Sequence, residues 1–104
     1  MQNLDLKDWE NGIKQDKNAV IIDVRSAEEY ETGHIPGAQQ INVQSPQDFM
    51  AQIADLDKST DYYVYCKSGN RSLQACQVLD FNGFSNIYSL EGGFENWKNH
   101  HTPD

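Results

Sequence analysis

The chain has 104 residues, of which 38% are hydrophobic, and this size and composition suit one globular domain spanning residues 1–104. Its formal net charge of -8 argues against a nucleic-acid partner or an anionic membrane surface, because both require a basic face on the protein. No apolar stretch has the length of a signal peptide or a membrane span, so we expect a soluble protein in a reducing, cytoplasmic compartment.

The predicted elements begin with an amphipathic helix in residues 4–18, where apolar residues recur at helical spacing from Leu4 onwards. Residues 19–24 (AVIIDV) form a nearly unbroken apolar run rich in β-branched residues, which is typical of a strand buried on both faces. A short helix is then expected from a Ser26 cap to a stop at Gly33.

The rest of the chain continues this alternation. After a Pro-Gly loop, a weak strand is expected at 38–43, followed by a helix with Ser45 as its cap and Pro46 at its first position. Further elements are expected in the order strand 61–66, helix 71–83, strand 85–90 and helix 92–99, with a frayed tail at 100–104. Strands alternating with helices predict an α/β fold with a central parallel sheet flanked by helices on both faces.

The segment CKSGNRS, residues 66–72, joins the predicted strand at 61–66 to the next helix. Ligands bind at the carboxyl ends of strands in such folds, and a loop with Gly69 at a helix N-terminus can point several backbone N–H groups at an anion. A thiol in that position, beside Lys67 and Arg71, is expected to be largely thiolate at neutral pH. Arg71 would add a fork of donors for an oxyanion.

The chain has two cysteines, Cys66 and Cys76, and they call for different interpretations. A cysteine that ends a strand is more often a core residue than a nucleophile, and Cys76 keeps the core interpretation because it lies on an apolar helix face. The neighbours Gly69, Arg71 and Ser72 favour a functional role for Cys66. Neither zinc-ligand spacing nor disulfide geometry suits the pair, so we expect two free thiols and no metal.

Four motifs resemble those of rhodanese-like sulfurtransferases and follow that family's order. Besides CKSGNRS, they are IIDVR at 21–25, EEYETGHIPGA at 28–38 and GGFENW at 92–97. The resemblance implies a single-domain rhodanese fold and a ping-pong reaction in which Cys66 becomes a persulfide. The implied sulfur donor is a small anion such as thiosulfate, the acceptor is cyanide, a thiol or another protein, and no cofactor is implied.

The resemblance also assigns roles to other residues. The loop after Cys66 corresponds to the family's amide cradle, which comprises Lys67, Ser68, Gly69, Asn70, Arg71 and Ser72. Asp23 and Arg25 correspond to a motif that mostly braces the site. His34 is expected to be a turn residue, because sulfite leaves as a stable anion and the reaction needs no general acid.

Two other interpretations stay open. Cysteine-dependent phosphatases share the cysteine, the amide cradle and the arginine, but their motif has five intervening residues, whereas four lie between Cys66 and Arg71 here. By this resemblance, the shorter loop fits a persulfide or thiosulfate sulfur better than a phosphoryl group. Related domains without the cysteine serve as non-catalytic binding modules, and the presence of both Cys66 and Arg71 counts against that alternative.

Overall fold

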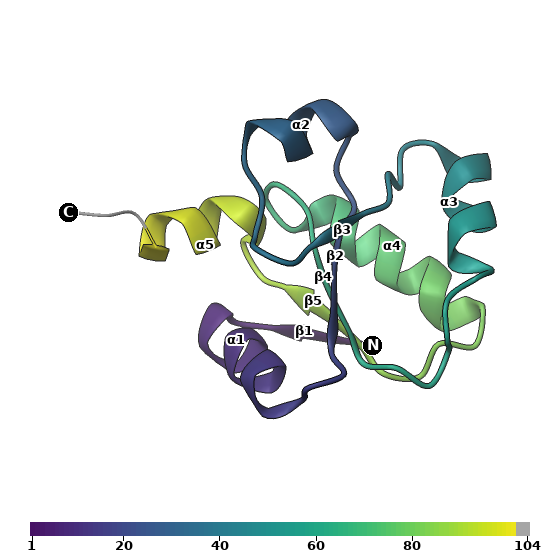
Figure 1. Cartoon of the computed structure of the whole chain (residues 1–104), viewed down its shortest axis with the longest axis horizontal. Coiled ribbons are helices and arrows are strands. Elements are labelled where there is room, and N and C mark those ends of the chain that lie inside the picture. The colour runs from purple at the N-terminus through teal and green to yellow at the C-terminus, as the bar shows by residue number, and fades with distance from the viewer. Residues whose placement is uncertain (102–104) are drawn as a thin grey trace.

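The computed structural model describes residues 1–101, which form a five-stranded parallel sheet covered by helices on both faces (Figure 1). The strands are β1 (Gln2–Leu4), β2 (Val20–Asp23), β3 (Gln39–Gln40), β4 (Tyr62–Tyr65) and β5 (Ile87–Leu90), and their order in the sheet is β1-β5-β4-β2-β3. The helices are α1 (Leu6–Gln15), α2 (Ala27–Thr32), α3 (Pro46–Ile53), α4 (Asn70–Phe81) and α5 (Gly93–His101). The predicted α/β class is confirmed.

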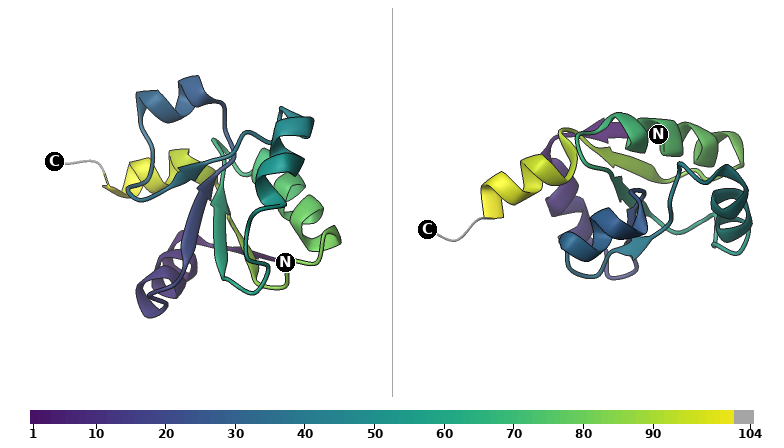
Figure 2. Two further views of the ribbon diagram at one scale, coloured as in Figure 1. Left: turned by 45° about the vertical axis from the view of Figure 1, so that its right-hand side comes forward. Right: turned by 90° about the horizontal axis from the view of Figure 1, so that it is seen from above.

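The central strand β4 separates two apolar cores. Val64 and Cys66 face the core that includes residues of α3 and α4, whereas Tyr63 and Tyr65 face the core that includes residues of α1 and α5. Figure 2 shows these two pairs of helices on opposite sides of the sheet. All four residues of β4 are buried, because strands flank it on both sides and helices cover both faces.

The N-terminal segment differs from the sequence-based expectation. Leu4 belongs to β1, which pairs in parallel with β5, and α1 begins only at Leu6. The carboxylate of Asp5 caps the helix by accepting a hydrogen bond of 2.9 Å from the backbone N–H of Asp8. A three-residue strand is too short to show alternation, so its pairing depends on a partner strand more than 80 residues away.

Helix α2 begins with a capping box. The backbone N–H of Glu29 donates to Ser26 Oγ at 3.3 Å, and the Ser26 N–H donates to Glu29 Oε1 at 3.2 Å. The predicted Ser26 cap is therefore confirmed, and the reciprocal bond also fixes the Glu29 side chain. Ser45 precedes α3, and Pro46 is its first residue as predicted, but Ser45 makes no side-chain cap bond.

Helix α5 continues through His101, further than the sequence indicated. His101 stacks on Trp97 with ring centroids 4.5 Å apart, and its Nε2 lies 2.8 Å from Glu10 Oε2 on α1. These contacts give the end of α5 a partner on the neighbouring helix. The remainder of the expected tail, residues 102–104, lies outside the described residues.

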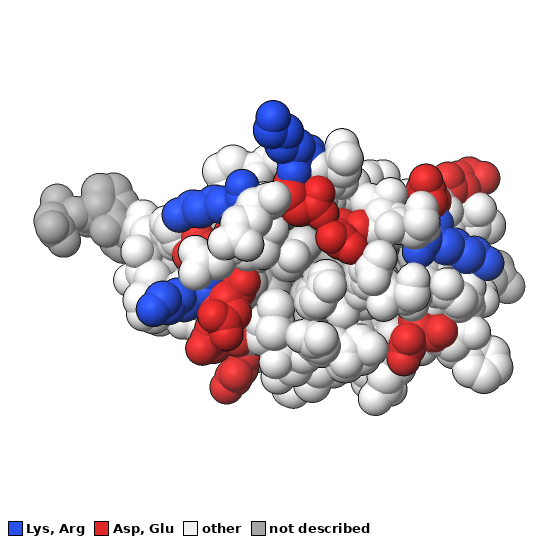
Figure 3. Space-filling view, turned by 90° about the horizontal axis from the view of Figure 1, so that it is seen from below, with Lys and Arg blue, Asp and Glu red and all other residues white. Residues whose placement is uncertain are grey.

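The surface shows mixed charge on one face. In Figure 3, lysine and arginine side chains form separate groups beside carboxylates rather than one continuous basic surface. Within residues 1–101, no helix combines the length and apolar character that crossing a membrane requires.

Candidate active site

Cys66 directly follows β4, at the carboxyl edge of the sheet. The loop that begins with this residue leads into α4. Gly69 is the N-cap of α4 and has a φ of 111°, a backbone conformation that residues other than glycine rarely adopt. A Cβ at Gly69 would also lie 3.3 Å from the backbone nitrogen of Gly92. The loop therefore needs glycine at this position for both its backbone conformation and its packing.

Hydrogen-bonding groups converge on the Cys66 sulfur. The backbone N–H of Gly69 donates to Cys66 Sγ at 3.0 Å, and the hydroxyl of Ser72 lies 3.6 Å from the same sulfur. The thiol is almost fully enclosed, with 1% of the residue exposed. A backbone N–H at the head of a helix stabilises negative charge on the sulfur, as a nucleophilic thiolate requires.

Ser72 belongs to a buried group of polar atoms behind the sulfur. Its hydroxyl donates to the carbonyl of Gly69 at 3.0 Å and lies 2.8 Å from the hydroxyl of Ser89 on β5. Sequence reasoning did not single out Ser89. The available signal was one small polar residue within the apolar strand IYSL, a weak signal without the neighbouring helix in view.

Arg71 is held in place by Glu29 of α2. Its Nη1 and Nη2 donate to Glu29 Oε1 and Oε2 at 2.7 and 2.8 Å, in the paired geometry that suits a carboxylate. This hydrogen-bonded contact lowers the pKa of the Glu29 carboxyl to about 2. The two bonds use two of the five N–H donors of the guanidinium, so Arg71 retains donors for an anion. The sequence analysis did not identify Glu29 as a partner.

Three other predicted cradle residues, Lys67, Ser68 and Asn70, are exposed to solvent. Ser68 and Asn70 have exposed side chains, and their role as anion ligands stays a prediction. The Lys67 side chain is 61% exposed, and its Nζ lies 3.9 Å from Glu95 Oε1. Lys67 therefore contributes a solvated charge near the loop rather than a fixed donor.

Asp23 and Arg25 form a buried ion pair beneath the loop. Arg25 Nη2 donates to Asp23 Oδ2 at 2.7 Å and to the carbonyl of Gly33 at 2.7 Å. The hydroxyl of Tyr65, next to Cys66 on β4, also donates to Asp23 Oδ2 at 2.7 Å. Burial and the hydrogen bond to Asp23 raise the pKa of the Tyr65 hydroxyl, so it stays a donor. The pair links β2, the end of α2 and β4, a geometry that suits the predicted bracing role.

The start of α5 anchors the backbone of the loop. The N–H groups of Phe94 and Glu95 donate to the carbonyls of Cys66 and Lys67 at 2.7 and 3.1 Å. Gly93 has a φ of 60°, and a Cβ there would come within 2.6 Å of both carbonyl oxygens. The GGFENW motif is therefore in direct contact with the backbone of the candidate nucleophile.

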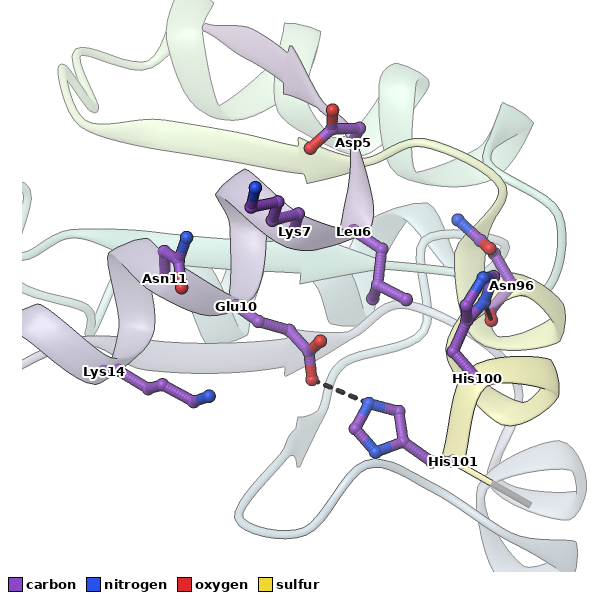
Figure 4. Close-up of a pocket in the computed structure, with 9 residues that line it drawn as sticks. All are labelled: Asp5, Leu6, Lys7, Glu10, Asn11, Lys14, Asn96, His100 and His101. Atoms are coloured by element: carbon purple, nitrogen blue, oxygen red, sulfur yellow. Dashed lines mark hydrogen bonds and ion pairs between the residues drawn. The ribbon is translucent and has the colours of Figure 1, made fainter.

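A separate groove lies between α1 and α5 (Figure 4). Its lining residues are Asp5, Leu6, Lys7, Glu10, Asn11, Lys14, Asn96, His100 and His101. None of the residues predicted for catalysis lies in it, and the pair formed by Glu10 and His101 crosses it. The candidate chemistry therefore lies at Cys66 and outside this groove.

The second cysteine does not compete with Cys66 as a nucleophile, because burial raises the pKa of the Cys76 thiol to about 12.

The fold and the site together define a class of protein. A buried thiol before a helix N-terminus, with an arginine fixed on the first turn of that helix, is suited to cysteine-dependent transfer of an anionic group at the edge of a parallel sheet. The model of the family called Rhodanese-like domain matches residues 6–100. The chain belongs to the rhodanese-like domain family, as its four motifs predicted.

Relatives and solved structures are consistent with this assignment. The chain is 44% identical over 82 residues to the protein named Thiosulfate sulfurtransferase GlpE from Pseudomonas entomophila, a match that covers 79% of this chain and 72% of the relative. It is 42% identical over 84 residues to the protein of the same name from Pseudomonas savastanoi pv. phaseolicola, covering 81% and 76% of the two chains.

Among solved structures, a rhodanese-related protein from Thermoplasma volcanium superposes with a TM-score of 0.81 at 27% identity, covering 99% of this chain and 96% of that one. A rhodanese-like domain protein from Staphylococcus aureus gives a TM-score of 0.80 at 30% identity, with coverages of 93% and 91%. The structural match therefore extends over nearly the whole chain.

Proposed function

We propose that the chain is a thiosulfate sulfurtransferase that carries sulfane sulfur as a persulfide on Cys66. The observation that carries the proposal is the buried Cys66 sulfur, which accepts a hydrogen bond from Gly69 N–H at the start of α4. The names of relatives at 44% and 42% identity support thiosulfate as the sulfur donor.

In the first half-reaction, the Cys66 thiolate attacks the outer sulfur of thiosulfate. The S–S bond of thiosulfate breaks, and its electron pair leaves with sulfite while a persulfide forms on Cys66. No proton has to move, because sulfite is a stable anion, so stabilisation of negative charge is the main requirement. Arg71 supplies a fixed cationic donor, and the backbone N–H groups of the loop supply the rest.

In the second half-reaction, an acceptor attacks the outer sulfur of the persulfide. The bond within the persulfide breaks, its electron pair returns to Cys66 as a thiolate, and the acceptor leaves with the sulfur. Cyanide gives thiocyanate in this step, and a small thiol or a protein cysteine is the proposed acceptor in the cell. A reducing compartment such as the cytoplasm would keep the two free thiols, Cys66 and Cys76, reduced.

Intact-protein mass spectrometry tests the proposal. Incubation with thiosulfate is expected to add the mass of one sulfur atom, and cyanide is expected to remove it as thiocyanate. The matched variants are Cys66→Ser, which should take up no sulfur, and Cys76→Ser, which should take up as much as the unmodified chain. An equal adduct on Cys66→Ser, or none on the unmodified chain, would contradict the proposal.

The same preparations distinguish the alternative functions. Hydrolysis of an aryl phosphate that depends on Cys66, without sulfur uptake, would identify a phosphatase. Binding of a protein partner that is unaffected by Cys66→Ser, again without sulfur uptake, would identify a non-catalytic module.

A further inference from the structure

Ser89 is a buried hydroxyl on an otherwise apolar face. It lies on β5 with no exposed surface and shares a face of the strand with Ile87, which packs in the core beside α4. A buried hydroxyl without a partner destabilises a core. Ser89 has two partners on α4, the hydroxyl of Ser72 at 2.8 Å on the first turn and the thiol of Cys76.

Either serine could donate in this pair, and the neighbouring bonds favour one arrangement. Ser72 has one hydroxyl proton, and it is directed to the carbonyl of Gly69 at 3.0 Å. The proton in the bond between the two serines therefore comes from Ser89. The oxygen of Ser72 also accepts from the Cys66 thiol at 3.6 Å, so the protonated thiol and Ser89 both donate to it.

Loss of the Cys66 proton changes this arrangement. The sulfur then accepts instead of donating, and the hydroxyl of Ser72 can turn from the Gly69 carbonyl towards it. Ser89 still donates to the Ser72 oxygen, which keeps that oxygen in place and polarises its O–H bond. A hydrogen bond donated by a group that itself accepts one is stronger, especially in a buried site.

We propose that Ser89 is a positioning residue that acts through Ser72 to stabilise the thiolate of Cys66. For the sulfur-transfer reaction, the inference rests on the proposed function. In that reaction, Ser89 favours the thiolate form of Cys66. This is the form that attacks thiosulfate and the form that leaves when the acceptor removes the sulfur.

The test measures the alkylation of Cys66 by iodoacetamide as a function of pH, which requires no sulfur donor. Cys66→Ser assigns the signal to Cys66. The other ionisable groups that interact with this sulfur, Arg71 and the Cys76 thiol on α4, are the same in all the serine variants. In Ser89→Ala the midpoint of the pH–rate profile is expected to rise by about 0.3 to 0.6 pH unit, because the loss of one cooperative bond weakens a charge-assisted one by a fraction of its strength. At pH values below the midpoint, the same change lowers the alkylation rate about two- to four-fold.

Two further variants separate this role from a general packing effect. Ser89→Thr keeps the hydroxyl and should keep the midpoint of the unmodified chain, and Ser85→Ala removes an exposed serine just before β5 and should also leave it unchanged. Because Ser89 acts through Ser72, the shift caused by Ser89→Ala should disappear in a Ser72→Ala background. An unchanged midpoint in Ser89→Ala, or an equal shift in both backgrounds, would overturn the proposal.

Two controls separate a folding defect from a failure of the proposed function. If Ser89→Ala does not fold, Ser72→Ala alone carries the test, and a midpoint equal to that of the unmodified chain would overturn the relay. Should thiosulfate fail to load Cys66 while the alkylation profiles shift as expected, the proposed function is wrong but the role of Ser89 stands. If thiosulfate loads Cys66 normally while the alkylation profiles do not shift, the proposed function stands and the role of Ser89 is wrong.

Discussion

At the scale of single residues, Glu29 serves two partners with one carboxylate. It closes the capping box with Ser26 at the start of α2 and binds Arg71 on α4 through both oxygens. The cap limits the directions that the carboxylate can take, so the short helix holds the arginine beside the candidate catalytic loop. The capping box is thus part of the construction of the site.

Replacing Glu29 with glutamine should weaken the binding of thiosulfate. Glutamine has an NH2 donor in place of one carboxylate oxygen, so it cannot accept both of the parallel bonds from the guanidinium. Arg71 then loses its fixed orientation, and the KM for thiosulfate should rise about three- to ten-fold with a smaller change in kcat. Steady-state thiocyanate formation measures both constants. Glu28→Gln, on the exposed side of the same helix, is the control, and a KM that stays level or falls in Glu29→Gln would contradict this role.

The same ion pair should make stability depend on pH. The pKa of the Glu29 carboxyl is about 2 in the folded protein, against an ordinary value of 4.5, so the stabilisation is complete above pH 4.5 and lost as the pH falls towards 2. Because both side chains are partly exposed, its size should be on the order of 1 to 2 kcal/mol. Urea unfolding should show this difference between the unmodified chain and Glu29→Gln at pH 6. A difference that persists at pH 2 would rule out the ion pair as its source.

Replacing Asp23 should lower the free energy of unfolding more than replacing any surface carboxylate. Asp23→Asn would leave Arg25 buried without its counter-charge, which should lower the free energy of unfolding by about 3 to 5 kcal/mol. Denaturant unfolding measures the loss, and Glu31→Gln on the exposed side of α2 should change stability by less than about 0.5 kcal/mol. Equal stability of the two variants would show that the buried pair does not brace the structure.

At the scale of elements, α5 connects the loop after Cys66 to α1. Its first residues hydrogen-bond to the carbonyls of Cys66 and Lys67, and near its other end Trp97 stacks between Phe94 and His101. Phe94 also stacks on Tyr65 of β4, and His101 pairs with Glu10 of α1, so the row of rings is attached to the sheet and to α1. Disturbing it should therefore affect stability and the position of the loop together.

Trp97→Ala tests this connection. Trp97 is only partly buried, so the substitution should lower the free energy of unfolding by about 2 kcal/mol, compared with about 3 to 5 kcal/mol for Trp9→Ala in the fully buried core. Thermal and urea unfolding measure both losses. If the two substitutions have equal effects, Trp97 belongs to the core as fully as Trp9 does.

At the scale of the whole molecule, the sequence predicted what is local in the chain. The strands at 20–23 and 62–65 could be predicted from their apolar composition. The loop from Cys66 to Ser72 is continuous in sequence, so its residues could be recognised without knowledge of the fold. Strand order and the β1 pairing could not be predicted, because they depend on contacts between distant segments.

The residues that complete the site are also distant in sequence. Glu29 lies 42 positions from Arg71, and Ser89 lies 17 positions from Ser72. Each has an adequate local explanation, as a helix cap or as a small residue in a strand. Their second role appears only when the fold brings β5 and α2 next to the first turn of α4.

In the proposed reaction, the burial of Cys66 imposes an order of access. With 1% of the residue exposed, the resting sulfur should react best with a slender donor whose terminal atom can reach into the loop. Loading then moves the reactive atom outward by one S–S bond, about 2 Å, to a point where a broader acceptor can meet it. We therefore expect the enclosure to restrict the size of the sulfur donor more strictly than the size of the acceptor.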